Sequence, residues 1–453
     1  MGCGPLARFF TSMFGTDKSV SRMLWGLLAV VLALSALYSF YYHDRPRVDA
    51  SAYDKIGWNL ARGLGYVEDE AKAGDPKSDE AIIRVGPGYE LFLAGGYSVF
   101  GHSIPAIWVL HAVLRAASAL LVFGIAILVF PGKSMIALGA AAIFGFTPDL
   151  VVINGLLLSE TLFIFFLLAA AYFSLRSFAH QASGTQVFSA GLFWALAILT
   201  RPVALLPFGM LILYFLWSRE LLRAFLLFVC PLVLVGSWSY YASMRYDSFI
   251  LTTTVGGYDL WVGNNPYAKG GFEKTPEIQE ARQRYASVEL DKIGKRKYFA
   301  YLASDPVGFA ELQLRKAALY FSALRPGGYW VHLMGRPRHL KATLAASFAA
   351  TLFLFVGGIA GAWRFFKERK DAAGRLFLAF AFLQPIAVIP IIVETRYRYA
   401  FFPFLAIFAA YFFSRRPLWA RALLGAALVV MFFTAYDAFR NWPEIIGKIS
   451  RVL

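Results

Sequence analysis

The sequence is short of charge, of acidic residues in particular, and of cysteine. Charged residues occupy 16% of the 453 positions, with 28 acidic against 44 basic side chains. The two cysteines, Cys3 and Cys230, lie near the N-terminus and inside an apolar segment, so they cannot build a disulfide framework. The six histidines are scattered and form no paired metal-binding motif. We therefore expect neither disulfides nor a histidine-based metal site.

Motifs that mark several common enzyme classes are also missing. The chain has no Walker A loop, no Rossmann glycine fingerprint and no nucleophile elbow. The net charge of +16 does not predict a nucleic-acid partner, because no basic run alternates with exposed aromatic residues.

Long apolar segments make up most of the chain. Hydrophobic residues reach 58%, whereas soluble domains are about 45–50% apolar. A span needs about 20 apolar residues, and we predict an all-α polytopic protein with about eleven transmembrane helices. The predicted spans are 23–42, 105–130, 134–150, 156–176, 187–200, 202–217, 221–242, 343–363, 376–393, 397–414 and 418–436. The first lies too deep in the chain and is too long for a signal peptide, so we interpret it as an uncleaved span.

Short loops rich in Lys and Arg orient these spans in the lipid bilayer. Such loops stay in the cytoplasm. The loops with Arg219 and Arg223 and the segment 364–375 all fall on one side, which we assign to the cytoplasm.

Two long loops remain on the opposite, external side, at 43–104 and 243–342. We therefore divide the chain into an N-terminal membrane module (1–242), an external region (243–342) and C-terminal membrane helices (343–453).

The external loops carry helical patterns of their own. Apolar residues recur at helical spacing in 49–64 and 89–100, which predicts helices lying along the membrane interface. The second loop opens with a Gly- and Asn-rich part, 256–271, followed by a charged helical pattern over 276–302. Asp305 and the proline after it then predict the start of another helix.

Asp49 and Tyr53 directly follow the first span. Their i, i+4 spacing places them on one helix face. A carboxylate at the interface can accept a proton from an attacking hydroxyl, as a general base does. The alternative is that Asp49 only caps the helix that follows it.

Several arginines are predicted at the external membrane edge. Arg84 precedes a Gly-Pro-Gly turn that leads into the helix with Tyr89, and a helix N-terminus attracts anions. Arg201, Arg396 and Arg398 lie at the outer ends of later spans, against the positive-inside trend. Converging arginines suit a phosphate or pyrophosphate, and the alternative is that they snorkel to lipid headgroups.

Two further sites carry polar groups. Glu160 lies at the outer end of an apolar segment, where an acid is costly and usually faces a cavity or a partner. It could act in the site directly or pair with Arg201. Asn264 and Asn265 follow an aromatic, Gly-rich stretch that could contact a sugar, although Gly-Asn-Asn-Pro is also ordinary turn chemistry.

Taken in order, these motifs resemble a known family. The pattern comprises Asp49-x-x-x-Tyr53, Pro87-Gly88-Tyr89, Ser159-Glu160, Leu199-Thr200-Arg201-Pro202, Gly263-Asn264-Asn265-Pro266 and Arg396-Tyr397-Arg398. It resembles that of GT-C membrane glycosyltransferases that use polyprenyl-phosphate sugars, among them the bacterial relatives of protein O-mannosyltransferases and of the lipid A aminoarabinose transferase.

The resemblance implies an inverting sugar transfer at the outer face of a bacterial inner (cytoplasmic) membrane. Asp49 corresponds to the catalytic acid that activates or orients the acceptor, while Arg84 and Arg396 correspond to residues on the donor phosphate. The acceptor would be a glycan, a lipid or a protein. Ala50 follows Asp49 where protein O-mannosyltransferases carry an Asp-Glu pair, which weakens the case for a protein acceptor. Members of the family differ in their need for a divalent metal, which stays open here because the sequence shows no ligand set.

Two other classes fit the span count. One is a lipid-linked oligosaccharide polymerase or flippase, although its acid and large loop are expected elsewhere than directly after the first span. The other is a non-catalytic scaffold or sensor, which should tolerate the loss of Asp49.

Overall fold

The described part of the chain is entirely helical. The computed structural model describes residues 17–72, 83–178, 183–324, 333, 335–415 and 419–450, and these contain no strand. The longer helices are α2 (Lys18–Tyr42), α3 (Asp49–Ala61), α4 (Gly88–Phe100), α5 (Ile104–Val129), α6 (Ser134–Gly145), α7 (Pro148–Asn154), α8 (Glu160–Ser177), α9 (Gly184–Thr200), α10 (Leu205–Trp217), α11 (Leu221–Tyr246), α12 (Gly256–Gly263), α13 (Pro276–Arg284), α14 (Ser287–Ser304), α15 (Pro306–Phe321), α16 (Pro337–Glu368), α17 (Ala372–Val388), α18 (Phe402–Ser414) and α19 (Ala420–Ser450). Short 3-10 turns are present at η1 (Glu70–Lys72), η2 (Pro202–Ala204) and η4 (Thr395–Ala400).

Each predicted span overlaps a helix, which confirms the polytopic all-α class. Among the described residues, six helices are long and apolar enough to cross a membrane, and a bent pair makes up to seven. Four shorter apolar helices accompany them, at Gly184–Thr200, Pro202–Trp217, Ala372–Val388 and Phe402–Ser414. The number of eleven spans therefore remains a prediction.

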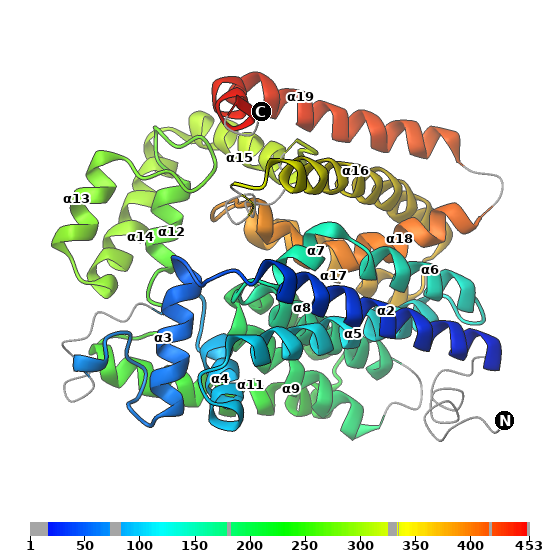
Figure 1. Ribbon diagram of the computed structural model, residues 1–453, viewed down its shortest axis with the longest axis horizontal. Coiled ribbons are helices and arrows are strands. Elements are labelled where there is room, and N and C mark those ends of the chain that lie inside the picture. The colour runs from blue at the N-terminus through cyan, green and yellow to red at the C-terminus, as the bar shows by residue number, and fades with distance from the viewer. Residues whose placement is uncertain are drawn as a thin grey trace.

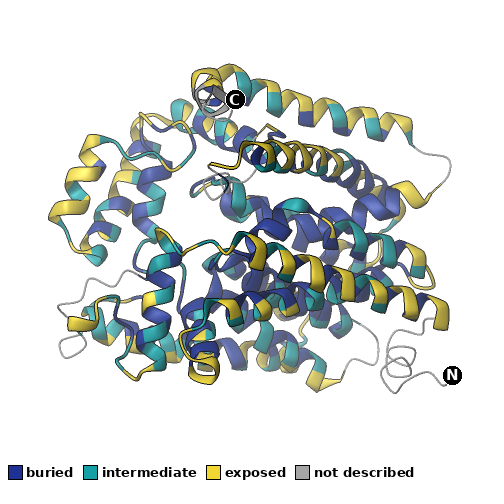
Figure 2. Ribbon diagram, in the orientation of Figure 1, coloured by how far each residue is buried: buried dark blue, intermediate teal, exposed yellow. Residues whose placement is uncertain are grey.

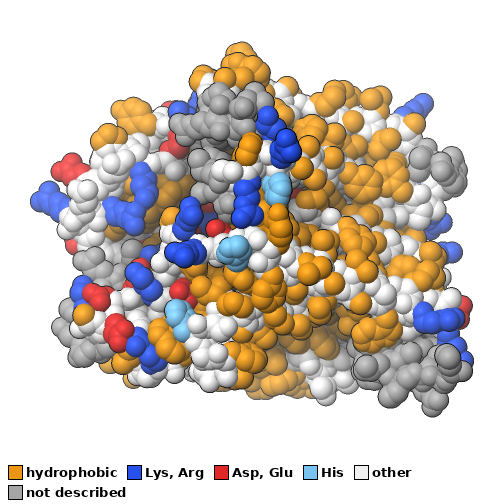
Figure 3. Space-filling view, in the orientation of Figure 1, with side chains coloured by type: hydrophobic (Ala, Val, Ile, Leu, Met, Phe, Trp, Pro, Cys, Tyr) orange, Lys and Arg blue, Asp and Glu red, His pale blue; other side chains and the backbone are white. Residues whose placement is uncertain are grey.

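The long helices present apolar side chains to the outside. In Figure 2 the outer faces of α2, α16 and α19 are exposed, while the helices between them are buried. Leu37, Phe353 and Phe432 are 69%, 41% and 54% exposed, and Figure 3 shows hydrophobic side chains covering the face over these helices. An apolar surface of this extent suits contact with lipid.

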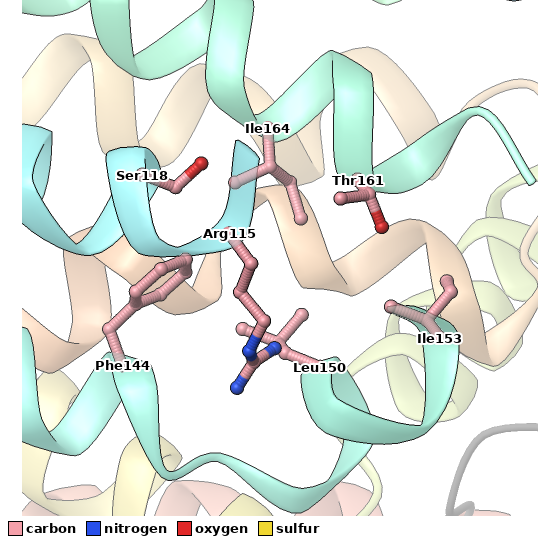
Figure 4. A pocket seen from close by; sticks show the side chains of 7 residues that line it. All are labelled: Arg115, Ser118, Phe144, Leu150, Ile153, Thr161 and Ile164. Carbon is pink, nitrogen blue, oxygen red and sulfur yellow. The ribbon is translucent and has the colours of Figure 1, made fainter. Parts of the chain in front are cut away.

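A break between α6 and α7 places polar groups in the middle of the apolar bundle. The two helices meet at an angle of 55°. Arg115 of α5 reaches the break and donates to the carbonyls of Gly145 (2.7 Å) and Thr147 (3.4 Å). Figure 4 shows its guanidinium directed toward α7, among Phe144 and Leu150. Arg115 thus satisfies carbonyls that a helix end would otherwise leave unpaired.

The short helix α7 then ties distant elements together. Asp149 accepts hydrogen bonds from Ser347 of α16 (2.7 Å) and from Tyr399 of η4 (3.1 Å). Asn154 donates to Ser39 of α2 (3.1 Å), and its carbonyl lies 3.1 Å from a ring nitrogen of His111 in α5. Buried polar groups need such partners, so α7 fixes the relative positions of α2, α5, α16 and η4.

The predicted external segments form separate helices at one end of the bundle, on the left in Figure 1. The two helical stretches are present as α3 and α4, while their position along the membrane interface remains a prediction. Asp305 caps α15 by accepting from the amide of Gly308 (2.9 Å). The single charged helix over 276–302 was wrong, because the chain breaks at Tyr285 into α13 and α14.

The Gly-rich stretch before Asn264 is a helix, α12, rather than a series of turns. A glycine in each helix, Gly257 in α12 and Gly294 in α14, permits the close packing of α12 against α14. A Cβ on Gly257 would lie 2.1 Å from the carbonyl oxygen of Asp291, and one on Gly294 would lie 2.1 Å from the carbonyl oxygen of Gly257.

The predicted orientation can be tested by labelling single cysteines from outside the cell. In a background without Cys3 and Cys230, we expect Lys274→Cys to react with a membrane-impermeant reagent in intact cells. Lys370→Cys should react only after permeabilisation, because its loop is assigned to the cytoplasm. Labelling of Lys370→Cys but not Lys274→Cys in intact cells would reverse the orientation.

Candidate active site

Arg84 lies in a turn that packs directly against the end of α9. Gly86 has a φ of 151°, and a Cβ there would lie 2.1 Å from the carbonyl oxygen of Leu199. A Cβ on Gly88 would lie 2.7 Å from the hydroxyl of Thr200. Only glycine permits this approach, and it brings Arg84 to the same region as Arg201, which directly follows Thr200.

Asp49 lies between two arginines from distant parts of the chain. Its Oδ2 accepts a hydrogen bond from Nη2 of Arg396 at 3.0 Å, and its Oδ1 lies 3.6 Å from Nε of Arg84. Asp49 is the first residue of α3, and the N-cap residue Val48 makes no side-chain capping bond. The side chain of Asp49 is 32% exposed. The Asp49 carboxylate therefore interacts with the two arginines and does not cap the helix.

Arg396 is the centre of a group of carboxylates. Besides Asp49, its Nε lies 2.7 Å from Glu394 and 3.6 Å from Glu160. Its guanidinium also lies over the ring of Tyr397, at 5.5 Å from the centroid. The negative charges of Glu394, Glu160 and Asp49 raise the pKa of Arg396 against the opposing effect of burial. Arg396 therefore stays positively charged at every relevant pH.

Glu160 and Arg201 form a buried ion pair behind this group. Nη2 of Arg201 donates to Oε1 of Glu160 at 2.8 Å, and its Nε donates to the hydroxyl of Ser159 at 3.1 Å. The ring of Tyr397 covers the Arg201 guanidinium at 4.9 Å. The predicted pairing of Glu160 with Arg201 is thus present. Since the Arg201 side chain is only 11% exposed, a positioning role suits it better than direct contact with a substrate.

Tyr53, one helical turn after Asp49, packs against Tyr89. Their rings meet edge to face at 5.3 Å, and the Tyr89 hydroxyl lies 3.3 Å from Nε2 of His111. Burial and the charge of Asp49 raise the pKa of Tyr53 well above its ordinary value, so its hydroxyl stays protonated. Both tyrosines are buried.

Three predicted site residues point elsewhere. Arg398 is fully buried, donates to the carbonyl of Ser322 (2.8 Å) and lies over the ring of Phe355. Asn264 donates to the carbonyl of Ile391 and accepts from Nζ of Lys316 (2.6 Å). Asn265 donates to carbonyls within α12. The prediction that these three contact the donor or the sugar is therefore not supported by their positions.

Four residues that the sequence analysis did not select belong to the group. Glu394 contacts Arg396 directly, and Glu68 lies 3.4 Å from Nη2 of Arg84. Asp259 of α12 and Lys274, in the loop after it, both lie within electrostatic reach of Asp49. Glu394 could have been found from its place two residues before Arg396, but no local signal pointed to the other three.

Asp259 is expected to be protonated at neutral pH. Removal from water, together with the negative charges of Glu394, Asp49 and Asp291, raises its pKa to about 8. A neutral Asp259 limits the negative charge that the site carries at neutral pH.

The arrangement could bind an anion, through Arg84 and Arg396, next to a potential base, Asp49. Arg84 and Arg396 offer two guanidiniums next to a partly exposed carboxylate, and guanidiniums bind phosphate oxygens in a bidentate manner. Among the described residues, no group of three or more His, Cys, Asp or Glu side chains is arranged to hold a metal ion.

Glu160→Gln should weaken donor binding more than it slows chemistry. The change leaves Arg201 with a neutral partner and removes one carboxylate from Arg396. Breaking a buried pair by removing one partner is strongly destabilising, so we expect lower thermal stability and a higher donor KM with a smaller change in kcat. A variant with wild-type donor affinity and no turnover would instead assign a catalytic role to Glu160.

The comparisons with known proteins agree with the resemblance seen in the motifs. Residues 84–239 match the family model of dolichyl-phosphate-mannose-protein mannosyltransferases. The comparison with curated proteins finds no match.

Solved structures of membrane enzymes are similar to this chain at low identity. ArnT from Cupriavidus metallidurans bound to undecaprenyl phosphate is 17% identical, with 89% of this chain and 63% of ArnT covered and a TM-score of 0.48. The oligosaccharyltransferase of Archaeoglobus fulgidus is 16% identical, with 93% of this chain and 53% of that chain covered and a TM-score of 0.49. The chain thus spans less than two thirds of either protein, and at these scores the similarity says nothing of its substrates.

Proposed function

We propose that this chain is an inverting membrane glycosyltransferase. It moves a sugar from a polyprenyl-phosphate donor to a hydroxyl of an acceptor, which is a cell-envelope glycan, lipid or protein at the outer face of a bacterial inner membrane. The family matched by residues 84–239 supports a lipid-phosphate donor. The single observation that carries the proposal is the position of Asp49 between Arg84 and Arg396.

The reaction requires a base and a site for the leaving phosphate. Asp49 takes the proton of the acceptor hydroxyl, whose oxygen attacks the anomeric carbon on the face opposite the phosphate. The carbon–oxygen bond to the phosphate breaks, and its electron pair leaves with the polyprenyl phosphate. Arg84 and Arg396 stabilise the charge that develops on the leaving oxygen, a contribution that is often the largest in such sites. Arg201 holds Glu160, which in turn orients Arg396.

The direct test is release of the lipid phosphate. Purified protein in detergent, given a polyprenyl-phosphate sugar labelled in the sugar and an extract of envelope acceptors, should yield free polyprenyl phosphate and a labelled acceptor. A flippase would move the labelled lipid across a vesicle membrane without releasing polyprenyl phosphate. A scaffold would do neither.

The pKa of Asp259 predicts a loss of donor affinity at alkaline pH. Below about pH 8 the side chain is neutral, and above it a new negative charge appears near Asp49 and Glu394. That charge repels the anionic donor, so the donor KM should rise as the pH passes 8. In Asp259→Asn this rise should disappear, whereas an unchanged profile would assign the alkaline limb to another group.

A further inference from the structure

A second group of cations lies outside the candidate site, where α2 ends and α16 begins. The segment after α2 carries Arg45 and Arg47, and the start of α16 carries Arg336, Arg338 and Lys341. All five are exposed, and among the described residues none of them forms an ion pair with a carboxylate. We call these five residues the basic patch. Figure 3 shows Lys, Arg and His side chains gathered at the middle of this face, beside the hydrophobic surface.

Aromatic contacts hold the two halves of the basic patch together. Arg336 lies over the rings of Tyr42 and Tyr41, at 5.3 and 5.7 Å. The hydroxyl of Tyr42 lies 2.9 Å from Nδ1 of His339. Because these contacts fix the start of α16 against the end of α2, the cations share one surface instead of moving independently.

The position of the basic patch at the ends of two candidate spans predicts that it lies at lipid headgroups. Both α2 and α16 are candidate spans with exposed apolar faces, and the patch begins where their apolar sequences end. Tyrosines at this position are typical of the membrane interface. In the predicted orientation the basic patch lies on the external side of the membrane. The positive-inside rule, which explains cations in cytoplasmic loops, therefore does not explain these cations. Cations at the start of α16 also face the positive end of its helix dipole, which disfavours them unless an anion is close by.

We propose that the basic patch is a binding site for an anionic phospholipid of the outer leaflet, distinct from the donor site. The phosphate lies among Arg336, Arg338 and Lys341, and the acyl chains lie along the exposed faces of α2 and α16. The chain continues from Arg47 directly into Asp49, and the amide of Ala50 donates to the carbonyl of Arg47 (3.1 Å). Bound lipid therefore restrains the connection that precedes the candidate base.

The test measures lipid binding and needs no enzymatic activity. Purified full-length protein is incubated with equal amounts of phosphatidylglycerol and phosphatidylcholine, and the bound lipids are identified by native mass spectrometry. The wild type should retain phosphatidylglycerol preferentially. The triple variant Arg336→Gln, Arg338→Gln and Lys341→Gln should bind it about 10²-fold more weakly, since each cation near a surface contributes about a fivefold factor.

A matched variant controls for the loss of three charges. Lys367→Gln, Lys370→Gln and Arg375→Gln remove three exposed cations at the other end of the bundle and should leave the lipid preference unchanged. Equal retention of both lipids by the wild type, or an unchanged preference in the patch variant, would overturn the proposal. Displacement of phosphatidylglycerol by equimolar polyprenyl phosphate would also overturn the proposal, because the patch would then be part of the donor site. If inorganic phosphate raised the thermal stability of the protein as much as phosphatidylglycerol does, the ligand would not be a lipid. These results are independent of whether the protein transfers sugars.

Discussion

Asp49→Asn is expected to slow sugar transfer by about 10²–10⁴-fold, the usual contribution of a positioned general base. The substitution keeps the volume of the side chain but removes the group that accepts the proton. Because Val48 is the N-cap residue and Asp49 makes no capping bond, the variant should fold normally. The rate is measured with saturating donor and acceptor on protein that elutes as a single species.

Asp54→Asn is the matched control for this experiment. Asp54 lies on the same helix and is also engaged, by the hydroxyl of Tyr97 (2.5 Å) and by Nε2 of His102 (2.9 Å). Its loss should lower stability without a comparable loss of rate. Near-normal transfer by a folded Asp49→Asn variant would remove the main support for the mechanism.

Arg396→Gln is expected to lower kcat/KM for the donor by at least about 10²–10³-fold, as for removal of one donor to a developing negative charge. The decrease in kcat/KM should exceed that caused by losing one binding contact. Without Arg396, the carboxylates of Asp49, Glu160 and Glu394 lose the positive charge that they share, and their negative charges then repel the anionic donor. Arg396→Lys should recover part of the rate, since lysine restores the charge but not the bidentate geometry.

Arg398→Gln distinguishes an arginine that stabilises the fold from one that acts in the candidate site. Arg398 lies only two positions from Arg396 but donates to the carbonyl of Ser322 in the protein core. We expect it to reduce thermal stability while the folded fraction keeps its kcat. A loss of kcat in folded Arg398→Gln equal to that in Arg396→Gln would show that both arginines act on the substrate.

The divergence of these two arginines shows why the sequence predicted only part of the site. Residues 395–400 form a 3-10 turn, in which three residues complete one turn and positions two apart face different directions. The Arg-Tyr-Arg motif indicated two cations at the membrane edge, but it did not reveal which one faces the site. That choice depends on Asp149 and Ser322, which contact Tyr399 and Arg398 from distant segments.

Other parts of the molecule could be predicted because their signals are local. The apolar periodicity placed α3 and α4, and the Asp-Pro sequence placed the start of α15. The motifs predicted that Arg84 and Arg201 lie at the same membrane edge. The Gly-Pro-Gly turn after Arg84 packs against Leu199 and Thr200, which directly precede Arg201. Asn264 could not be placed in this way, because its amide pairs with the carbonyl of Ile391, far away in the chain.

The shared carboxylate of Asp49 has a consequence for kinetics. In the resting protein this one side chain contacts both guanidiniums that a donor phosphate requires. Donor binding is then an exchange of one anion for another, and it frees Asp49 to accept a proton. An acceptor that arrives first meets a base still held by its arginines. Under the proposed function, initial-rate measurements should therefore follow a compulsory order with the donor first, and the phosphate-bearing product should inhibit competitively against the donor.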